Sequence, residues 1–288
     1  MTDPKKSCLT SKAVLCNLTI KVPKKQQEDK EETRKLREKA AGRDVISAHK
    51  KLFTKEAFAD IMTVIGKARK LPAQYGFPWG LGIFLVPLLN YEKLNSALVT
   101  LKVDFEKLAQ EKVDKYESMV EEAKTLLGDL FNPADYPSKE IFAKKFGFSF
   151  DIYPVPASDH FVLQAEAELI QKFQESVDEK IKETEESFSK HLLDRIIPVV
   201  SKMAEDFKGK DKNFHKSLIG NIDNIIDLVP ALNILNDPKI AEFAEEIKRK
   251  LTNVSMDTLK KDKGLRAEKA ETASDIVNRM SSYYQEVK

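Results

Sequence analysis

The stretch YEKLNSALVTLKVDFEKLAQEKVDKYESMVEEAKTLLGDL, residues 91–130, decides the fold. Large apolar side chains recur in it every three or four residues, which is the period of one face of an α-helix. After Leu108 the stripe shifts by one residue and then continues. At 1.5 Å per residue the stretch predicts a single helix of about 60 Å. Its apolar members are Tyr91, Leu94, Leu98, Leu101, Phe105, Leu108, Val113, Tyr116, Val120, Ala123, Leu127 and Leu130.

A second stripe of similar length runs from Ile170 to Met203, and Pro198 is expected to kink it. Between the two stripes, Ser138 opens a short helix and an aromatic alternation from Phe148 to Tyr153 predicts a strand. Apolar faces after residue 209 predict further helices. We therefore predict a mainly α protein, with a long antiparallel helical hairpin, a small α+β head and additional C-terminal helices.

The chain is divided into six predicted segments. Loose alternation from Leu9 to Val22 predicts a strand that Pro23 ends, and the highly charged residues after it predict a linker or a weakly anchored helix. The only tryptophan, Trp79, follows Pro78 in a Gly/Pro-rich connection, and we expect this pair to be a buried structural anchor. The segments are 1–23, 24–53, 54–130, 131–164, 165–208 and 209–288.

The composition and the cysteine positions argue against several partners and cellular locations. With 48 Lys and Arg against 46 Asp and Glu, the net charge of +2 creates no global field that would attract nucleic acid or anionic lipid. Cys8 and Cys16 would lie roughly 26 Å apart in an extended segment, too far to pair. The longest apolar run, Gly82 to Leu89, is too short to span a membrane, and no secretory signal opens the chain. We expect a cytoplasmic protein without membrane contact.

The sequence contains no convincing motif for phosphate binding, metal binding or nucleophilic catalysis. The glycines near Trp79 are interrupted by Pro78 and have no lysine to meet a phosphate, and the four histidines are too scattered to hold a metal. Ser158, Asp159 and His160 are the one suggestive triplet, but adjacent residues of a polar turn rarely face one another. We predict no catalytic, cofactor-binding or metal-binding residues and no cofactor, and the triplet remains a minor enzyme hypothesis.

Two basic clusters keep nucleic-acid binding open as the alternative, because lysine and arginine neutralise phosphates. Neither cluster is interleaved with the aromatic side chains that stack on single-stranded bases, and acidic residues dilute the first. The solvated-face interpretation is therefore preferred. The candidate contacts are Lys24, Lys25, Arg34 and Lys35 in the first cluster and Lys248, Arg249 and Lys250 in the second, which extends through Lys260, Lys261 and Lys263.

The apolar stripes favour a role in protein–protein contacts. Two long seams expose their flanks unless other helices or other chains cover them. C-terminal helices folding back would leave a monomer, whereas exposed seams would make a homo-oligomer. The leading hypothesis is a non-enzymatic scaffold or adaptor, and the alternative is a DNA-associated accessory factor of recombination or replication.

Three stretches together resemble an uncharacterised family of proteins encoded by bacteriophages and integrative mobile elements. They are Leu9 to Thr19, Pro78 to Tyr91 and Leu130 to Pro156, the last with Asp135-Tyr136-Pro137-Ser138 and Pro154-Val155-Pro156, and their combination is more specific than any one of them. The resemblance covers about residues 8–235 and carries no established activity. Because members tend to be encoded beside a CobS/MoxR-like ring ATPase or near recombination genes, the resemblance implies an accessory role and such an ATPase as a partner.

Overall fold

The computed structural model describes residues 9–40, 44–158, 167–208 and 217–287. The chain forms two compact units, each discontinuous in sequence. Unit 1 contains residues 1–16, 72–94 and 152–288, and unit 2 contains residues 17–71 and 95–151. Two helices and two strands continue from one unit into the other, namely α3 (Ala59–Tyr75), α4 (Leu88–Asp114), β1 (Ala13–Lys21) and β6 (Gly147–Pro154).

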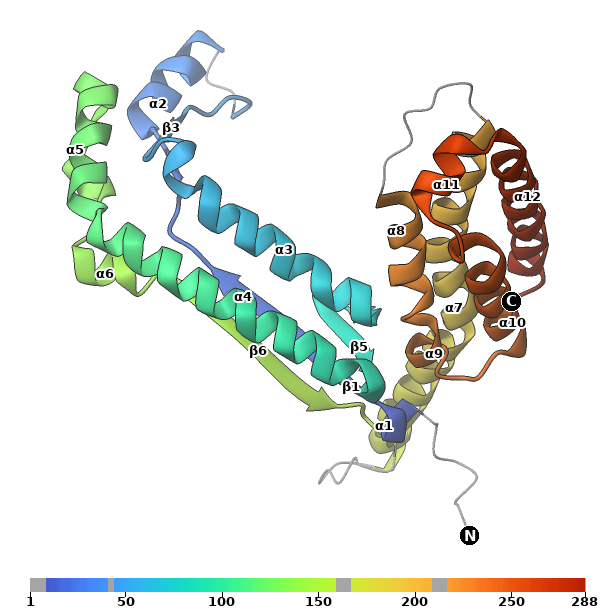
Figure 1. The fold of residues 1–288 in the computed structure, drawn as a ribbon. Helices are drawn as coiled ribbons and strands as arrows, with labels where there is room; N and C mark the ends of the chain where they lie inside the picture. The colour runs from blue at the N-terminus through green and yellow to red at the C-terminus, as the bar shows by residue number, and fades with distance from the viewer. Residues whose placement is uncertain (1–8, 41–43, 159–166, 209–216, 288) are drawn as a thin grey trace. The chain divides into compact units, whose positions relative to one another are not determined.

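Unit 1 is built around the longest helix, α7 (Ala167–Lys208), which packs along α12 (Lys263–Glu286) (Figure 1). The buried residues of α7 recur every three or four positions, from Ile181 through Phe188, Leu192 and Ile196 to Phe207. A helical face with this period can bury against helices on more than one side. The other elements of the unit are α1 (Leu9–Lys12), α8 (Ser217–Ile226), α9 (Val229–Leu232), α10 (Pro238–Ile247), the π-helix Lys248–Thr252 and α11 (Met256–Lys261).

A polar hub ties three helices of unit 1 together. Asp237 caps α10 by accepting the backbone N–H groups of Lys239 and Ile240, at 2.9 and 3.3 Å. Its second oxygen accepts the hydroxyl of Ser189 from α7 and, at 2.8 Å, that of Tyr283 from α12. One carboxylate therefore satisfies a helix terminus and two partly buried hydroxyls that would otherwise lack an acceptor.

Unit 2 closes an aromatic core from short elements far apart in the sequence. Phe142 stacks on Tyr116 with ring centroids 4.1 Å apart, and Phe53 lies 5.9 Å from Phe142 and 5.7 Å from Tyr136. Tyr116 and Tyr136 donate their hydroxyls to the carbonyls of Pro137 and Leu52, at 2.6 and 3.0 Å. The elements are β2 (Gln26–Glu28), α2 (Lys30–Lys39), β3 (His49–Lys51), α5 (Tyr116–Leu127), α6 (Lys139–Ala143) and the short 3₁₀ turns Glu56–Phe58, Gly128–Leu130 and Pro133–Asp135.

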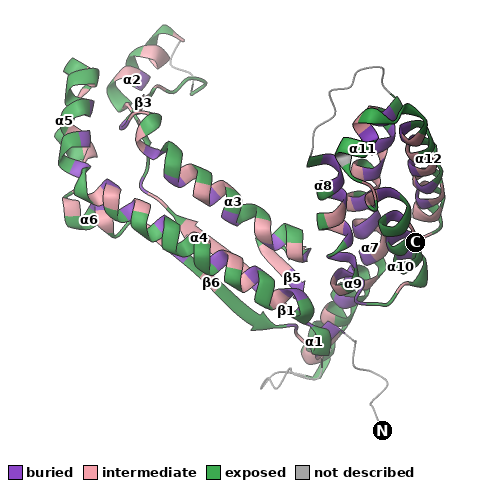
Figure 2. Ribbon diagram, in the orientation of Figure 1, coloured by how far each residue is buried: buried purple, intermediate pink, exposed green. Residues whose placement is uncertain are grey.

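The strands form two small sheets. One has four strands in the order β4-β5-β1-β6, with β4 (Phe77–Gly80) and β5 (Ile83–Pro87) as an antiparallel hairpin. The other pairs β2 with β3 so that Gln27 lies opposite Lys50. In Figure 2 the buried positions of α3 and α4 repeat along one side of each helix, as amphipathic helices require.

The predicted mainly α fold with a small α+β part is confirmed, including the Ser138 cap of α6 and the strand from Gly147 to Pro154. The expected partner of the second long helix is different, since α7 packs on α12 within unit 1. Both helices are long and apolar along one face, so the stripe alone did not reveal which helix would cover it.

The first long helix is not continuous, which corrects the prediction of a single 60 Å rod. It stops at Asp114 and restarts at Tyr116, and Figure 1 shows α5 leaving α4 at a steep angle. Tyr116, the first residue after the break, is buried and stacks on Phe142. The buried residues keep a spacing of three or four positions across the break, from Phe105 through Lys112 and Tyr116 to Met119.

Several shorter predictions are also corrected. Residues 9–12 form a helical turn before β1. The segment predicted as a linker or a weakly anchored helix contains the short strand β2 and the helix α2, which Asp29 caps. The connection around Trp79 is a regular hairpin. Two helices contain a proline within their span, α3 at Pro72 and α7 at Pro198. Cys16 is buried with a free thiol, and Cys8 lies outside the described residues.

Candidate functional site

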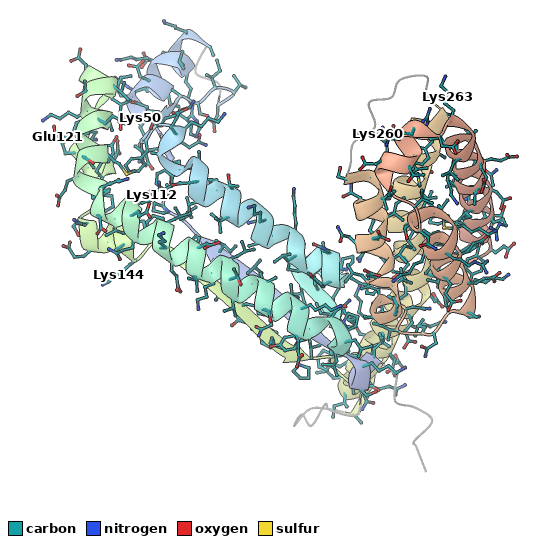
Figure 3. The ribbon with its side chains drawn as sticks, viewed as in Figure 1. Lys50, Lys112, Glu121, Lys144, Lys260 and Lys263 are labelled. Carbon is teal, nitrogen blue, oxygen red and sulfur yellow. The ribbon has the colours of Figure 1, made fainter. Side chains whose placement is uncertain are left out.

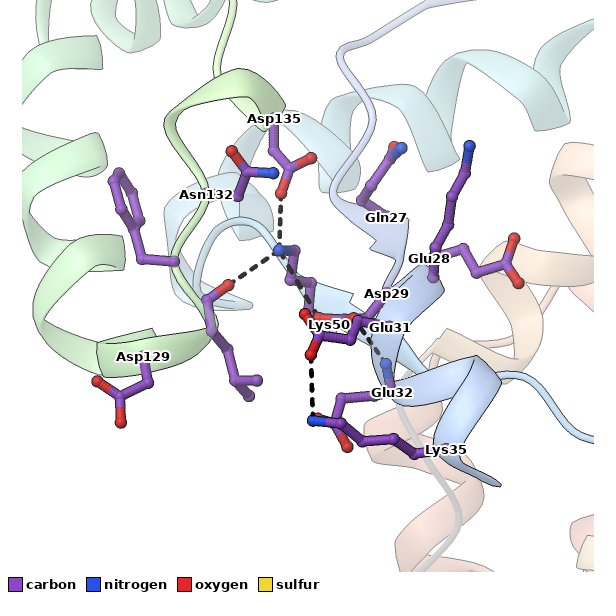
Figure 4. Close-up of a pocket in the computed structure, with 13 residues that line it drawn as sticks. Gln27, Glu28, Asp29, Glu31, Glu32, Lys35, Lys50, Asp129, Asn132 and Asp135 are labelled. Carbon is purple, nitrogen blue, oxygen red and sulfur yellow. Dashed lines mark hydrogen bonds and ion pairs between the residues drawn. The ribbon is translucent and has the colours of Figure 1, made fainter. Parts of the chain in front are cut away.

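A cavity of unit 2 opens between the start of α2, strand β3 and the loop after α5 (Figure 4). Its volume is about 780 Å³. Six acidic residues and three lysines are among its lining residues, so it carries a formal charge of 3 − 6 = −3. The lining residues are Gln27, Glu28, Asp29, Lys30, Glu31, Glu32, Lys35, Lys50, Asp129, Leu130, Phe131, Asn132 and Asp135.

Local backbone chemistry shapes this cavity. Asp29 is the N-cap of α2, and its carboxylate accepts the N–H of Glu32 at 3.0 Å. Its own N–H donates to the carbonyl of Ala48 at 2.9 Å, which brings β3 beside the start of the helix. Across the cavity, Asn132 caps the turn Pro133–Asp135 through the N–H of Ala134. Asx residues at two caps thus determine the direction of both walls.

Lys50 is the centre of the site. Its ammonium lies 2.8 Å from Asp135 Oδ2 and 3.8 Å from Asp29 Oδ2, and it donates to the carbonyl of Leu130 at 2.9 Å. The side chain is only 10% exposed and that of Asp135 14%, so solvent does little to screen the pair. Lys50 therefore joins β3, the α2 cap and the loop at residue 130, three segments that are distant in sequence (Figure 4).

The electrostatics favour the ionised form of Asp29. The hydrogen bond from the Glu32 N–H holds the pKa of Asp29 below its ordinary value, and the charge of Lys50 acts in the same direction. The Lys50 ammonium donates a hydrogen bond to the Leu130 carbonyl and forms ion pairs with the carboxylates of Asp135 and Asp29. Within the described residues no group of three or more His, Cys, Asp or Glu side chains could hold a metal ion.

The structure places the two predicted basic clusters in separate units. In the first, Lys24 and Lys25 are exposed on the approach to β2, whereas Arg34 lies 3.5 Å from Glu38 and Lys35 2.8 Å from Glu32 on α2. These intrahelical pairs reduce the charge available to a phosphate, although exposed pairs of this kind are weak. The acidic residues that diluted the sequence pattern are thus also neighbours in space.

The second basic cluster begins with three consecutive cations. Lys248, Arg249 and Lys250 are all exposed on the π-helix, where Lys248 pairs with Asp227 at 2.7 Å and Lys250 with Glu246 at 2.8 Å. Glu246 also accepts Arg279 at 2.6 Å. Lys260 and Lys263 lie at the junction of α11 and α12 (Figure 3).

The hypothetical Ser158 triplet is not testable in this structure. Ser158 is half-buried just before the undescribed segment, and Asp159 and His160 lie outside the described residues. Two of the four histidines are described: His49 is exposed on β3, and His191 on α7 is half-buried beside Phe77 with ring centroids 6.2 Å apart. Burial lowers the pKa of His191, with the neighbouring Arg195 charge adding to the effect.

The buried anchor of the β4–β5 hairpin is Phe77, whereas Trp79 is half-buried and Pro78 exposed. Phe77 packs on Phe188 of α7 with centroids 4.5 Å apart, and the Arg195 guanidinium lies over its ring at 5.1 Å. Arg195 also donates to the carbonyl of Gly76. The strand register shifts between Pro78 and Gly80, and Trp79 packs against the unit 1 core as a partly buried residue.

The tip of this hairpin exposes an apolar side chain. Leu81 is fully exposed in the turn between β4 and β5, where Gly82 adopts a positive φ of 74°. The root of the same hairpin is fully buried at Phe77, Leu85 and Val86. Gly76 has no space for a side chain, because a Cβ there would lie 2.5 Å from the carbonyl oxygen of Leu85. The hairpin therefore presents Leu81 from a rigid base.

Sequence reasoning missed Lys50, Arg195 and Leu81 as notable residues. Lys50 is one of many lysines in a charged region, and its pairing with Asp135 depends on a contact across the unit 2 fold. The one available signal was at the hairpin: residues 71–91 contain no charged side chain, although charged residues make up 33% of the chain. Such a long neutral stretch in a highly charged chain indicates a core or an interface.

The chain belongs to the DUF3150 family, described as proteins of unknown function, whose model matches residues 11–281. The match spans both units and nearly all described elements. No curated protein and no solved structure matches the chain. No helix among the described residues is long and apolar enough to cross a membrane.

Proposed function

We propose that this DUF3150 protein is a non-enzymatic adaptor that binds a protein partner through the β4–β5 hairpin, with Leu81 as the anchor residue. The observation that carries the proposal is the contrast within one hairpin between a fully exposed leucine at the tip and a fully buried root. An exposed apolar side chain on a pre-organised base loses little conformational entropy on binding.

The surroundings of Leu81 support a protein partner with an apolar pocket. Leu88 and Leu89 follow β5 within the same uncharged stretch and are 48% and 75% exposed. Burying such leucines is favourable by roughly 25 cal/mol per Å² of apolar surface removed from water, and no charge of residues 71–91 would have to be desolvated with them. A catalytic role has no comparable support among the described residues.

The setting that we propose comes from the resemblance to phage and mobile-element proteins. In it the chain acts in the bacterial cytoplasm beside a CobS/MoxR-like ring ATPase, and the ATPase is the partner. The hairpin fits this role because Phe77 and Arg195 hold its root on α7.

The test is direct binding of the purified CobS/MoxR-like ATPase from the same genome, measured by titration calorimetry. The wild-type chain should bind, and Leu81→Asp should weaken binding about 30-fold or more, as loss of a hot-spot residue does. Leu126→Asp, which changes a 66% exposed leucine on α5 of unit 2, is the matched control and should bind like the wild type.

Two results would count against the proposal. If the wild-type chain does not bind the ATPase at tens of micromolar, the proposed partner is wrong. If Leu81→Asp and Leu126→Asp bind as tightly as the wild type, the hairpin is not the contact. Circular dichroism of both variants guards against unfolding, since each substitution lies on an exposed position.

The second candidate function is DNA association through the basic residues of the π-helix. It is favoured by the exposure of three consecutive cations, Lys248, Arg249 and Lys250, and opposed by their carboxylate neighbours Asp227 and Glu246. Fluorescence anisotropy with a labelled duplex at 50 mM salt tests it. Binding that weakens steeply with salt and drops further in Arg249→Gln would favour this function, and no binding at low salt would exclude it.

A further inference from the structure

Strand β6 forms one edge of the four-stranded sheet. The strand order β4-β5-β1-β6 gives it β1 as a neighbour on one side, and no described strand lies on the other. The strand is eight residues long, GFSFDIYP from Gly147 to Pro154. An edge of this length presents a row of backbone N–H and C=O groups that can pair with another strand.

The two faces of β6 differ in character. Phe148 is buried and packs against Phe105 of α4, with ring centroids 5.6 Å apart. Phe150 on the same face is half-buried, and Ile152 is 41% exposed. The opposite face carries Ser149, Asp151 and Tyr153, all exposed. The apolar side chains of the helix-covered face therefore become more exposed toward the end of the strand.

This edge has few of the features that prevent strand pairing. Soluble proteins usually protect edges with lysines, prolines, bulges or very short strands. Here Asp151 is the only charge in the strand and Pro154 stands at its end. Aromatic and β-branched residues, which favour strands, occupy four of the remaining positions, namely Phe148, Phe150, Ile152 and Tyr153.

We propose that β6 pairs antiparallel with β6 of a second copy of this chain, about a two-fold axis through Phe150. The strand is self-complementary in that register. Phe150 meets Phe150, Phe148 meets Ile152, Ser149 meets Asp151 and Gly147 meets Tyr153. Apolar residues lie opposite apolar residues on the helix-covered face, and the aromatic ring of Tyr153 covers the strand opposite a glycine.

Other antiparallel registers of the β6 pair bring less favourable side chains opposite each other. A register centred on Asp151 places the two carboxylates opposite each other, and like charges at directly opposed positions are destabilising. A register centred on Ser149 leaves Ile152 and Tyr153 beyond the pairing. Shifts by a single residue bring the covered face of one copy opposite the exposed face of the other, because side chains alternate with period 2.

This interface does not depend on the proposed Leu81 contact, since it uses a different strand and a different partner. It predicts a reversible dimer with two-fold symmetry, the commonest form of self-association. Light scattering over a concentration series should show the mass rising from 32.7 kDa toward twice that value.

Opposite charge changes at Ser149 give the sharpest test. Ser149→Lys places an ammonium opposite Asp151 of the second copy, and Ser149→Asp places a carboxylate there, each twice per dimer. Relative to the wild type, the dimer dissociation constant should fall in the first variant and rise in the second by roughly two- to thirtyfold. The double variant Ser149→Asp with Asp151→Lys should restore the affinity. Ser96→Lys and Ser96→Asp, at an exposed position of α4, control for net charge.

Cross-linking tests the register itself. In a Cys8→Ser background, Ser149→Cys and Asp151→Cys are oxidised separately and as a mixture. A disulfide should form in the mixture and not in either variant alone, because equivalent residues of the two copies lie too far apart to bridge. Cys16 adds no background, since its thiol is buried and burial raises its pKa to about 12.

Three results would overturn the proposal. A constant mass of 32.7 kDa up to about 100 µM would exclude the second copy. A dimer whose dissociation constant is the same in Ser149→Lys and Ser149→Asp would place the interface elsewhere. Disulfides that form equally well in either single variant would exclude the register centred on Phe150.

Discussion

The two units of this protein close their cores in different ways. Unit 1 is aliphatic and helical: Ile, Leu and Met side chains of α7 meet α12 and the helices around it, and the Asp237 hub ties the helices together. Unit 2 is aromatic and is assembled from short segments, with rings from residues 53–142 in one cluster and with Lys50 joining strand β3, the cap of α2 and the loop at residue 130. The comparison shows that long amphipathic helices can form a core with few specific side-chain contacts. A core made of short segments depends on individual ring contacts and ion pairs.

The single tryptophan makes this comparison measurable. Trp79 lies in unit 1, so its emission reports unfolding of unit 1, while far-UV circular dichroism reports both units. If the units unfold separately, a substitution in unit 2 should shift only the dichroism transition. If they unfold together, both signals should shift equally.

The largest effect is expected from the aromatic core of unit 2. Phe142→Ala should cost about 3–5 kcal/mol of unfolding free energy, because Phe142 is 1% exposed and contacts the rings of Phe53, Tyr116 and Phe146. Denaturant unfolding followed by circular dichroism measures it. The adjacent Ile141→Ala, at an exposed position, should change stability by less than about 0.5 kcal/mol. Equal effects at the two positions would show that the cluster is not a core.

Removing the buried cation of unit 2 should have the next largest effect. Lys50→Met leaves the Asp135 carboxylate buried without its partner and should cost about 2–4 kcal/mol. Lys35→Met removes an exposed helical ion pair with Glu32 and should cost less than about 0.5 kcal/mol. The same denaturant measurement applies, and a Lys50→Met protein as stable as Lys35→Met would contradict the role assigned to the Lys50 contacts.

The hub of unit 1 should be somewhat less sensitive. Asp237→Ala removes the N-cap of α10 and the acceptor of Ser189 and Tyr283, at a cost of about 2–3 kcal/mol. Ser255→Ala, which removes the exposed cap of α11, should cost only about 1 kcal/mol. Because the hub lies in unit 1, the transition seen by Trp79 emission should move in Asp237→Ala. An unmoved Trp79 transition would contradict the division into units.

The smallest effects concern two tyrosines, one in each unit. Burial raises the pKa of Tyr136 to about 12, and burial together with the Asp237 hydrogen bond raises that of Tyr283 to about 12. Since unfolded tyrosine ionises near pH 10, both should stabilise the protein fully below pH 10, and this contribution should be lost as the pH rises toward 12. Tyr136→Phe and Tyr283→Phe should each cost about 1 kcal/mol at pH 7.

The control for the tyrosines is the pH dependence itself. Denaturant midpoints measured from pH 9 to 12 should fall less steeply in each Phe variant than in the wild type. The Trp79 transition should respond to Tyr283→Phe, and the dichroism transition should also respond to Tyr136→Phe. A slope that neither substitution changes would show that other groups are responsible for the alkaline loss of stability.

The sequence by itself determined the features that depend on neighbours within a few residues. The apolar stripes predicted α4, α5 and α7, Ser138 predicted the cap of α6, and the aromatic alternation predicted β6. Helical faces, caps and strand alternation involve residues one to four positions apart. The spacing of residue types in the sequence therefore reveals these local structures.

Only the tertiary structure decided the rest, because the deciding contacts join residues far apart in the chain. Lys50 and Asp135 are 85 positions apart, and Arg195 reaches Gly76 across 119. Tyr116 stacks on Phe142, and Phe77 packs on Phe188 of a helix more than a hundred residues further along the chain. Such contacts depend on the shapes of the packed surfaces and on the exclusion of water. Neither property leaves a regular spacing of residue types in the sequence.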